Sequence, residues 1–222
     1  MSFDWNAVYN ALPTLLDGVK LTLLISVLGI PSGFILGLFL GMARAYRLPI
    51  LNFIALIYIE IIRGTPMILQ VMFIYFALPQ ISFFGFHIRF DAVTAGIITI
   101  MINSAAYMAE IVRGALLSVH NGLREAGLAL GLPSWKVVFK VILPIAWRRM
   151  IPPLGNQCII SLKDTSLLSV VSIAELMRRA TEIASTNYNY VEILSTVAVL
   201  YLILTVSLTI LLRIIEKRIR ML

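Results

Sequence analysis

Hydrophobic positions in this chain come in long unbroken blocks, separated by short polar segments. Four windows contain no Asp, Glu, Lys or Arg: residues 21–43, 64–87, 92–109 and 193–212. A fifth, 150–174, is apolar apart from Lys163 and Asp164. A bilayer-crossing helix needs about 20 mostly apolar residues, and the second block extends back to about Ile50. We therefore expect five spans in a single transmembrane domain, 1–222, at about residues 18–43, 50–79, 92–115, 146–171 and 192–213.

Composition supports the same fold class. Hydrophobic residues make up 60% of the 222 positions and charged residues only 13%, about half the charged share of a soluble domain. Membrane β-barrels show roughly ten-residue segments of alternating polarity, whereas these blocks are continuous. The single cysteine excludes a disulfide scaffold. The sequence predicts an all-α integral membrane protein, a five-helix transmembrane bundle.

The distribution of basic residues predicts the orientation. Twelve of the eighteen Lys and Arg residues lie in segments 44–50, 110–149 and 213–222, against four in the segments on the other side. Because cytoplasmic loops carry the excess of positive charge, we expect the N-terminus outside and the C-terminus inside. Topology thus accounts for the net charge of +7, and we expect no nucleic-acid partner.

The N-terminal fifth of the chain suggests two features. Apolar residues recur at helical spacing in residues 1–19, which predicts a helix in the outer membrane interface, with Pro13 as a point of interruption. The first span then repeats glycine every fourth residue. Such a stripe favours close approach of another helix backbone, although membrane helices are also glycine-rich in general. The stripe comprises Gly29, Gly33, Gly37 and Gly41.

No catalytic or cofactor motif is found. A nucleotide-binding P-loop requires a Gly-Lys pair, and the sequence contains none. His87 and His120 are the only histidines, too few for a metal cluster, and both fall in predicted loops. We expect no enzyme activity and no cofactor in this chain. Any ATP, with its Mg²⁺, would be bound and hydrolysed by a partner.

A long inner loop, 120–144, predicts a helix–turn–helix. Residues 123–130 form the first short amphipathic helix, Gly131 stops it, and Ser134 caps the second. Pro144 ends that second helix or begins the next. The hairpin is apolar for a segment in water, which favours docking against another protein; the alternative is an ordinary loop packed on its own bundle.

In this loop the sequence resembles permease subunits of binding-protein-dependent, ATP-driven (ABC) importers. Those proteins carry E-A-A, three residues, G, nine residues and I-x-L-P. Here Gly127 replaces the third position and Val141 the isoleucine. The resemblance implies a coupling loop seated on a cytoplasmic ATPase dimer. The implied ATPase-coupling residues are Arg124, Glu125, Ala126, Gly127, Gly131, Leu132, Leu143 and Pro144.

Other segments resemble the histidine/glutamine-type subfamily of polar amino acid permeases. They include residues 60–66, 71–79, 103–107, 124–132, 152–157 and 163–167. The resemblance implies a multi-pass protein of the bacterial inner membrane that translocates polar amino acids by alternating access. Among them, L-glutamine is the expected substrate. It also implies a periplasmic or extracellular solute-binding protein as a further partner.

Ionisable residues inside predicted spans are costly and face a partner or a watery cavity. Pro66 removes the hydrogen bond to the carbonyl of Ile62, which predicts a kink with a free carbonyl. One arrangement pairs Asp164 with Arg63 and Lys163 with Glu60 across helices. Either these charges only hold the bundle together or they border the path of a zwitterion. The candidate pathway residues are Arg63, Thr65, Asn103, Lys163, Asp164 and Thr165.

Five helices enclose little space, so we expect a second permease subunit, identical or a sibling, with the path along the two-fold axis. A self-sufficient secondary transporter or channel is the main alternative. Many secondary transporters contain inverted repeats, and no internal repeat is visible here. A non-transporting assembly subunit is a third possibility, but it leaves the embedded charges unexplained.

Overall fold

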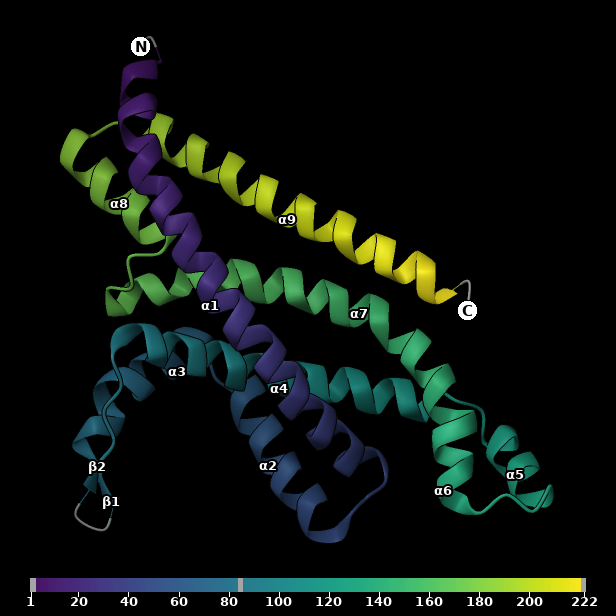
Figure 1. The fold of residues 1–222 in the computed structure, drawn as a ribbon. Helices are drawn as coiled ribbons and strands as arrows, with labels where there is room; N and C mark the ends of the chain where they lie inside the picture. The colour runs from purple at the N-terminus through teal and green to yellow at the C-terminus, as the bar shows by residue number, and fades with distance from the viewer. Residues whose placement is uncertain (1–2, 84–85, 221–222) are drawn as a thin grey trace.

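The computed structural model describes residues 3–83 and 86–220 and is almost entirely helical (Figure 1). The positions 1–2, 84–85 and 221–222 of the predicted domain lie outside the described residues. The α-helices in chain order are α1 (Trp5–Ala45), α2 (Pro49–Gly64), α3 (Met67–Met72), α4 (Ala92–Leu117), α5 (Asn121–Ala129), α6 (Ser134–Val137), α7 (Leu143–Asp164), α8 (Leu176–Asn187) and α9 (Tyr190–Arg220).

The remaining elements are short. Phe73–Ala77 and Val138–Ile142 are π-helical turns, and Leu78–Gln80 and Thr165–Val171 are 3₁₀ turns. One departure from the all-α prediction is a small antiparallel hairpin of β1 (Ser82–Phe83) and β2 (Phe86–His87), in which Ser82 pairs with His87. Two residues a strand are too few to be visible as a sequence pattern.

Helix α1 is one uninterrupted helix of 41 residues. Asp4 caps it by accepting hydrogen bonds from the backbone N–H of Asn6 at 2.9 Å and of Ala7 at 3.3 Å. The expected break at Pro13 is wrong, because α1 continues through both Pro13 and Pro31. At about 1.5 Å per residue, it is about twice as long as the ~30 Å hydrocarbon core of a bilayer.

The glycine stripe of α1 is a packing seam against α4. A Cβ on Gly33 would lie 2.8 Å from the carbonyl oxygen of Met101, and one on Gly37 would lie 2.8 Å from that of Ala105. Gly41 approaches Ala109 still more closely. The glycines of α1 thus lie against the backbone and β-carbons of α4 over about three turns, so the predicted seam is confirmed.

Helices α2 and α3 meet at a sharp bend. The axis of α2 and that of the helical stretch Met67–Gln80, which begins with α3, differ by 106° across a break of a few residues that contains Pro66. The kink predicted from Pro66 is therefore confirmed. Within the described residues, α1, α4 and α9 are each long and apolar enough to cross a membrane, and the bent pair qualifies as one more span. Helix α7 carries four charged residues and is not among them.

The main core lies where α1, α4 and α7 meet. Ile25, Ile100, Met108 and Met150 are buried there, each with at most 1% of its surface exposed. Figure 1 shows α8 beside the N-terminal part of α1, while α5 and α6 lie at the opposite end of the bundle. The most apolar stretch of α9 has no buried residue, so this helix presents a wide apolar face.

The inner hairpin differs in detail from its prediction. Helix α5 spans Asn121–Ala129, and Gly131 adopts a left-handed φ of 77° after it, as expected for a glycine stop. Pro133, not Ser134, is the residue before α6, and no side chain caps that helix. After α6 the chain continues through the π turn directly into α7. Pro144 therefore lies in the first turn of α7 and does not end the second helix of the hairpin. Because Pro144 has no N–H to donate, a wider turn before it accommodates the missing bond.

Candidate functional site

The break between α2 and α3 is closed by a buried glutamine. Gln70, 9% exposed, donates from Nε2 to the carbonyl oxygen of Ile62 at 2.7 Å and to that of Thr65 at 3.0 Å. Its Oε1 accepts a hydrogen bond from Asn103 Nδ2 of α4 at 3.0 Å. The carbonyl that Pro66 leaves unpaired therefore does not stand free, as expected from the sequence, but is held by a side chain that also binds the neighbouring helix.

A cavity of about 450 Å³ opens beside this break. It is bordered by residues from α2, α3, α4, α7 and the turn that follows α7. Four of the six predicted pathway residues, Arg63, Thr65, Asn103 and Asp164, are among them. The full lining comprises Arg63, Gly64, Thr65, Pro66, Met67, Asn103, Tyr107, Gln157, Ile160, Asp164 and Leu167.

The cavity wall carries charges of both signs. The Arg63 guanidinium lies 5.4 Å from the ring centre of Tyr107, in cation–π range. The Asp164 carboxylate comes from the C-terminal end of α7. Across residues 3–83 and 86–220, no ion pair joins Arg63 to Asp164 or Glu60 to Lys163. The cross-helix pairing expected from the sequence is therefore wrong. Among the described residues, neither Arg63 nor Asp164 of the cavity wall forms an ion pair.

Two predicted pathway residues lie outside this lining. Thr165 is buried and donates from Oγ1 to the carbonyl oxygen of Leu162 at 2.7 Å, so its hydroxyl is used within its own turn. Lys163 is exposed. Adjacent side chains on a helix point about 100° apart. Asp164 therefore lines the cavity while Lys163 points away from it.

Sequence reasoning missed three polar residues of this region. Gln70 closes the break, and Tyr107 and Gln157 line the cavity. Tyr107 lies four residues after Asn103, a spacing that places both on one helix face and could have indicated it. Gln157 Nε2 donates to Ser161 Oγ at 3.3 Å, and Ser161 bonds to Ser104 of α4 at 2.9 Å. These residues join α4 to α7 behind the cavity.

The inner hairpin presents an exposed surface on a fixed turn. Arg124, Glu125 and Ala126 are exposed on α5, and Leu130 is 82% exposed. Gly127 faces α6: a Cβ there would lie 3.0 Å from Val137 Cγ2, so this position sets how closely the two helices approach.

The remaining predicted coupling residues of the hairpin shape its base. Gly131 makes the turn, and Leu132 donates its N–H to the carbonyl oxygen of Gly127 at 3.1 Å, closing the end of α5. Leu132 and Leu143 pack in part against the main core, whereas Pro144 is exposed. The hairpin is thus anchored at its base and free at its tip.

A second polar cluster lies at the other end of the bundle, on α8. Glu175 is fully buried and caps α8 by accepting hydrogen bonds from the backbone N–H of Met177 at 2.9 Å and of Arg178 at 2.6 Å. The Tyr201 hydroxyl of α9 donates to the same carboxylate at 3.1 Å. Burial raises the pKa of Glu175 to about 7. Glu175 lies between the predicted spans 146–171 and 192–213, and no pattern in the sequence indicated a role for it.

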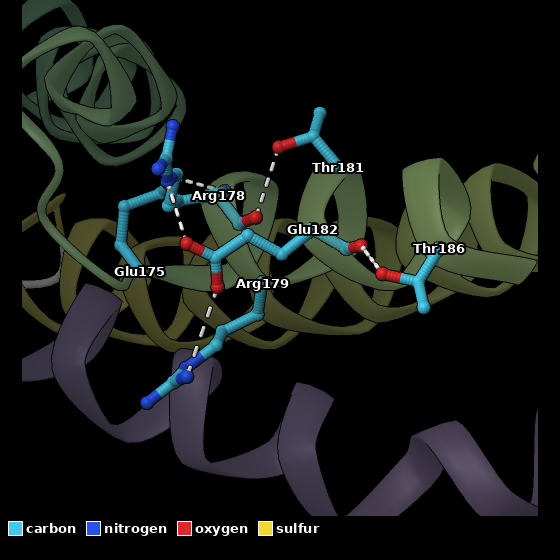
Figure 2. Close-up of polar contacts among 6 residues, drawn as sticks. All are labelled: Glu175, Arg178, Arg179, Thr181, Glu182 and Thr186. Atoms are coloured by element: carbon cyan, nitrogen blue, oxygen red, sulfur yellow. Dashed lines mark hydrogen bonds and ion pairs between the residues drawn. The ribbon is translucent and has the colours of Figure 1, made fainter.

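The exposed face of α8 is charged. Figure 2 shows Arg178 and Arg179 both directed at the carboxylate of Glu182, at 2.7 Å and 3.8 Å. Thr181 and Thr186 donate their hydroxyls back to the backbone of the same helix, to Arg178 and Glu182. This helix is thus held internally by its own side chains, with its ion pairs on the outside.

Comparison with known proteins gives a consistent result. Residues 29–221 match the family described as binding-protein-dependent transport system inner membrane component. The chain is 55% identical over 223 residues to the glutamine transport system permease protein GlnP of Escherichia coli (strain K12), with all of both chains covered. It is 33% identical over 220 residues to the arginine transport system permease protein ArtQ of Bacillus subtilis (strain 168), covering 99% of each.

A solved structure agrees with the sequence relatives. The chain matches one described as an amino acid ABC transporter with histidines at a TM-score of 0.88 and 34% identity. The match covers 98% of this chain and all of that one. Fold and sequence therefore point to the same family over nearly the whole length.

Proposed function

The chain belongs to the binding-protein-dependent transport system inner membrane components, and on that premise we propose that it imports L-glutamine. It is the membrane-spanning permease subunit of an ABC importer for amino acids. The observation that carries the choice of glutamine is the 55% identity to GlnP over the full length of both chains. It contains no ATPase of its own; a separate ATPase subunit hydrolyses the ATP.

The proposed setting is the bacterial inner membrane, crossed five times, with the N-terminus outside. The excess of basic residues near α5, α6 and the end of α9 supports this orientation. In this proposal α7, the fourth span in chain order, brings the number of spans to five. Its packing against α1, α4 and α9 supports that position, and its charges then lie near the two membrane surfaces and on the cavity wall.

The proposed substrate path runs through the cavity beside the α2–α3 break. A zwitterionic amino acid carries one carboxylate and one ammonium, and the wall offers the Arg63 guanidinium and the Asp164 carboxylate, neither paired with the other. Thr65 and Asn103 add polar groups to that wall. Lys163 and Thr165 complete the proposed set. An exposed lysine at membrane depth is costly unless it faces water or a partner, which supports a place for Lys163 on the path in the assembled importer.

The proposed power stroke enters through the inner hairpin, residues 120–144. Its exposed tip, with Arg124, Glu125 and Ala126 on α5, would seat on a cytoplasmic ATPase dimer. The helix continues without a break from α6 into α7, which ends at Asp164. A displacement of the tip therefore has a rigid route to the cavity wall, which supports alternating access as the mechanism.

The remaining proposed partners follow from surfaces that one chain leaves open. A second permease subunit, identical or a sibling, would cover apolar faces such as that of α9. An external solute-binding protein would deliver the amino acid to the end of the bundle that carries α8. Lipid covers the rest of the apolar surface.

ATP-dependent uptake by the reconstituted complex tests this proposal. Permease, ATPase and binding protein in liposomes should accumulate labelled glutamine only with ATP, and unlabelled glutamine should compete better than glutamate, arginine, histidine or cystine. The permease alone should accumulate nothing. Concentrative uptake by the permease alone, driven by a proton or sodium gradient, would show instead a self-sufficient secondary transporter.

Charge-neutral variants test the path. Arg63→Gln and Asp164→Asn should lose most uptake at normal membrane abundance, whereas Glu60→Gln, an exposed position on α2 outside the cavity lining, should transport normally. Loss of protein from the membrane in both cavity variants, with normal transport by what remains, would assign these charges to bundle stability alone.

A further inference from the structure

A second cavity lies along the helix that joins the inner hairpin to α7. It has a volume of about 480 Å³ and is lined by Lys140, Val141, Pro144, Ile145, Arg148 and Arg149. Three of these six residues are cations and none is an anion. We refer to this cavity as the basic groove.

The cations of the groove have few internal partners. Arg149 donates to both the carbonyl and the hydroxyl of Ser118, the residue that follows α4. Neither Lys140 nor Arg148 forms an ion pair with any carboxylate in the part of the chain that the structure describes. Both side chains are exposed. Two cations with no anionic neighbour, beside a third that is held in place, make a site suited to an anion.

The groove also has an apolar floor at the level where a membrane begins. Arg149 is tied to the end of α4, a helix long and apolar enough to cross a membrane, so the groove lies at the inner end of that helix. Val141 and Ile145 supply aliphatic surface next to the cations. A cation above an aliphatic wall matches a phosphate group attached to acyl chains.

We propose that the basic groove binds the headgroup of an anionic phospholipid of the inner leaflet. The phosphate would lie between Lys140 and Arg148, and the upper acyl chain would lie along Val141 and Ile145. The inference rests on the proposed orientation, which places this end of α7 on the cytoplasmic side. Three of its lining residues, Lys140, Val141 and Pro144, lie at the base of the hairpin, and the other three lie beyond it on α7. The groove extends away from the tip that would seat on the ATPase: Ser134 and Arg148 are about 21 Å apart along a helix, at 1.5 Å per residue.

Tryptophan quenching measures this binding directly. Trp147 is next to Arg148 in the sequence and 38% exposed. With Trp5→Phe and Trp135→Phe as background, it is the only tryptophan of the chain. The permease, assembled with ATPase subunits that have been made free of tryptophan, is placed in nanodiscs containing brominated phosphatidylglycerol or brominated phosphatidylcholine. We expect severalfold preferential quenching by the anionic lipid.

The variants make the site specific. Lys140→Gln with Arg148→Gln should lower the relative affinity for phosphatidylglycerol roughly tenfold. The matched control, Arg213→Gln with Lys217→Gln, removes the same charge from exposed positions near the inner end of α9, outside both the groove and the hairpin, and should keep the preference. ATP-driven uptake by the control variant provides a check on folding, and circular dichroism provides one for the groove variant.

Several results would overturn the inference. Equal quenching by the two lipids would show an unselective lipid shell, and equal loss in the groove and control variants would show a general surface-charge effect. Displacement by millimolar inorganic phosphate would show a site for free anions. Quenching that is present for the permease alone but absent in the complex would show that a protein subunit covers the groove. None of these results bears on whether the chain imports glutamine, which the uptake assay decides.

Discussion

The side-chain nitrogen of Gln70 lies 2.7 Å from the carbonyl oxygen of Ile62, across the break that Pro66 makes between α2 and α3. The same side chain accepts a hydrogen bond from Asn103 of α4. One glutamine therefore satisfies the broken helix and ties it to its neighbour. The bend of 106° is therefore held by hydrogen bonds on both sides of the break.

Replacing Gln70 should loosen this break. Gln70→Leu keeps the volume but leaves the carbonyls of Ile62 and Thr65 and the Asn103 amide without their partner, at about 1–3 kcal/mol for each buried group. We expect a lower Tm of the complex and severalfold slower uptake. Gln80→Leu is the control, because Gln80 donates only to the exposed turn at Phe76. If the two substitutions lowered the Tm and the uptake rate equally, Gln70 would not be what holds the break between α2 and α3.

The α1–α4 seam should reject even one methyl group. Gly33→Ala would place a Cβ 2.8 Å from the Met101 carbonyl oxygen and 2.9 Å from Ser104 Cβ, both on a packed helix. Overpacking of this kind costs about 1–3 kcal/mol, so thermal stability in detergent should fall. Gly114→Ala on α4 meets nothing within 4 Å and should be neutral or stabilising by about 0.5–1 kcal/mol. A Gly33→Ala variant as stable as Gly114→Ala would contradict the seam.

The turn of the inner hairpin should depend on glycine at one position. Gly131 has a φ of 77°, a conformation that costs an L-residue about 1–2 kcal/mol. Gly131→Ala should therefore distort the turn between α5 and α6 and reduce the amount of glutamine imported per ATP hydrolysed. Ser134→Ala should leave that ratio unchanged, since no side chain caps α6. An unchanged ratio in Gly131→Ala would indicate that the turn does not transmit the stroke.

The buried carboxylate of Glu175 predicts a pH dependence of stability. Burial raises its folded-state pKa from about 4.5 to about 7, so the folded protein holds this proton more tightly than the unfolded chain does. By linkage, the stabilisation is complete below pH 4.5 and is lost as the pH rises through 7. The Tm of the complex should therefore fall by several degrees between pH 5 and pH 8.

Substitution assigns that fall to one residue. Glu175→Gln keeps a hydrogen-bond acceptor for the N-terminus of α8 and cannot ionise, so its Tm should vary much less over the same pH range. Glu182→Gln removes an exposed carboxylate from the same helix and should retain the wild-type pH profile. If Glu175→Gln and the wild type fall in parallel, the dependence arises elsewhere.

The sequence by itself determined the class of the molecule, the kink and the glycine packing face of α1, whereas the structure identified α4 as the helix that packs on that face. Each of these features follows from a local pattern. Long charge-free blocks give the apolar length of a span, a proline removes a backbone donor, and glycine at every fourth position defines one face of a helix. The turn of the inner hairpin could also be predicted, because Gly131 ends its first helix. The motif of this hairpin also indicates the family from sequence alone.

Only the tertiary structure decided which polar groups meet. Gln70 closes the break, Glu175 is buried under Tyr201, and Arg63 faces Tyr107 in place of Asp164. Each of these contacts joins residues that the sequence separates by between 8 and 44 positions, or depends on burial that neighbouring helices create. Spacing along one helix gives the direction of a side chain, but its partner and its desolvation depend on how separate helices pack. That packing is why the cavity could be anticipated only in part and the buried glutamate not at all.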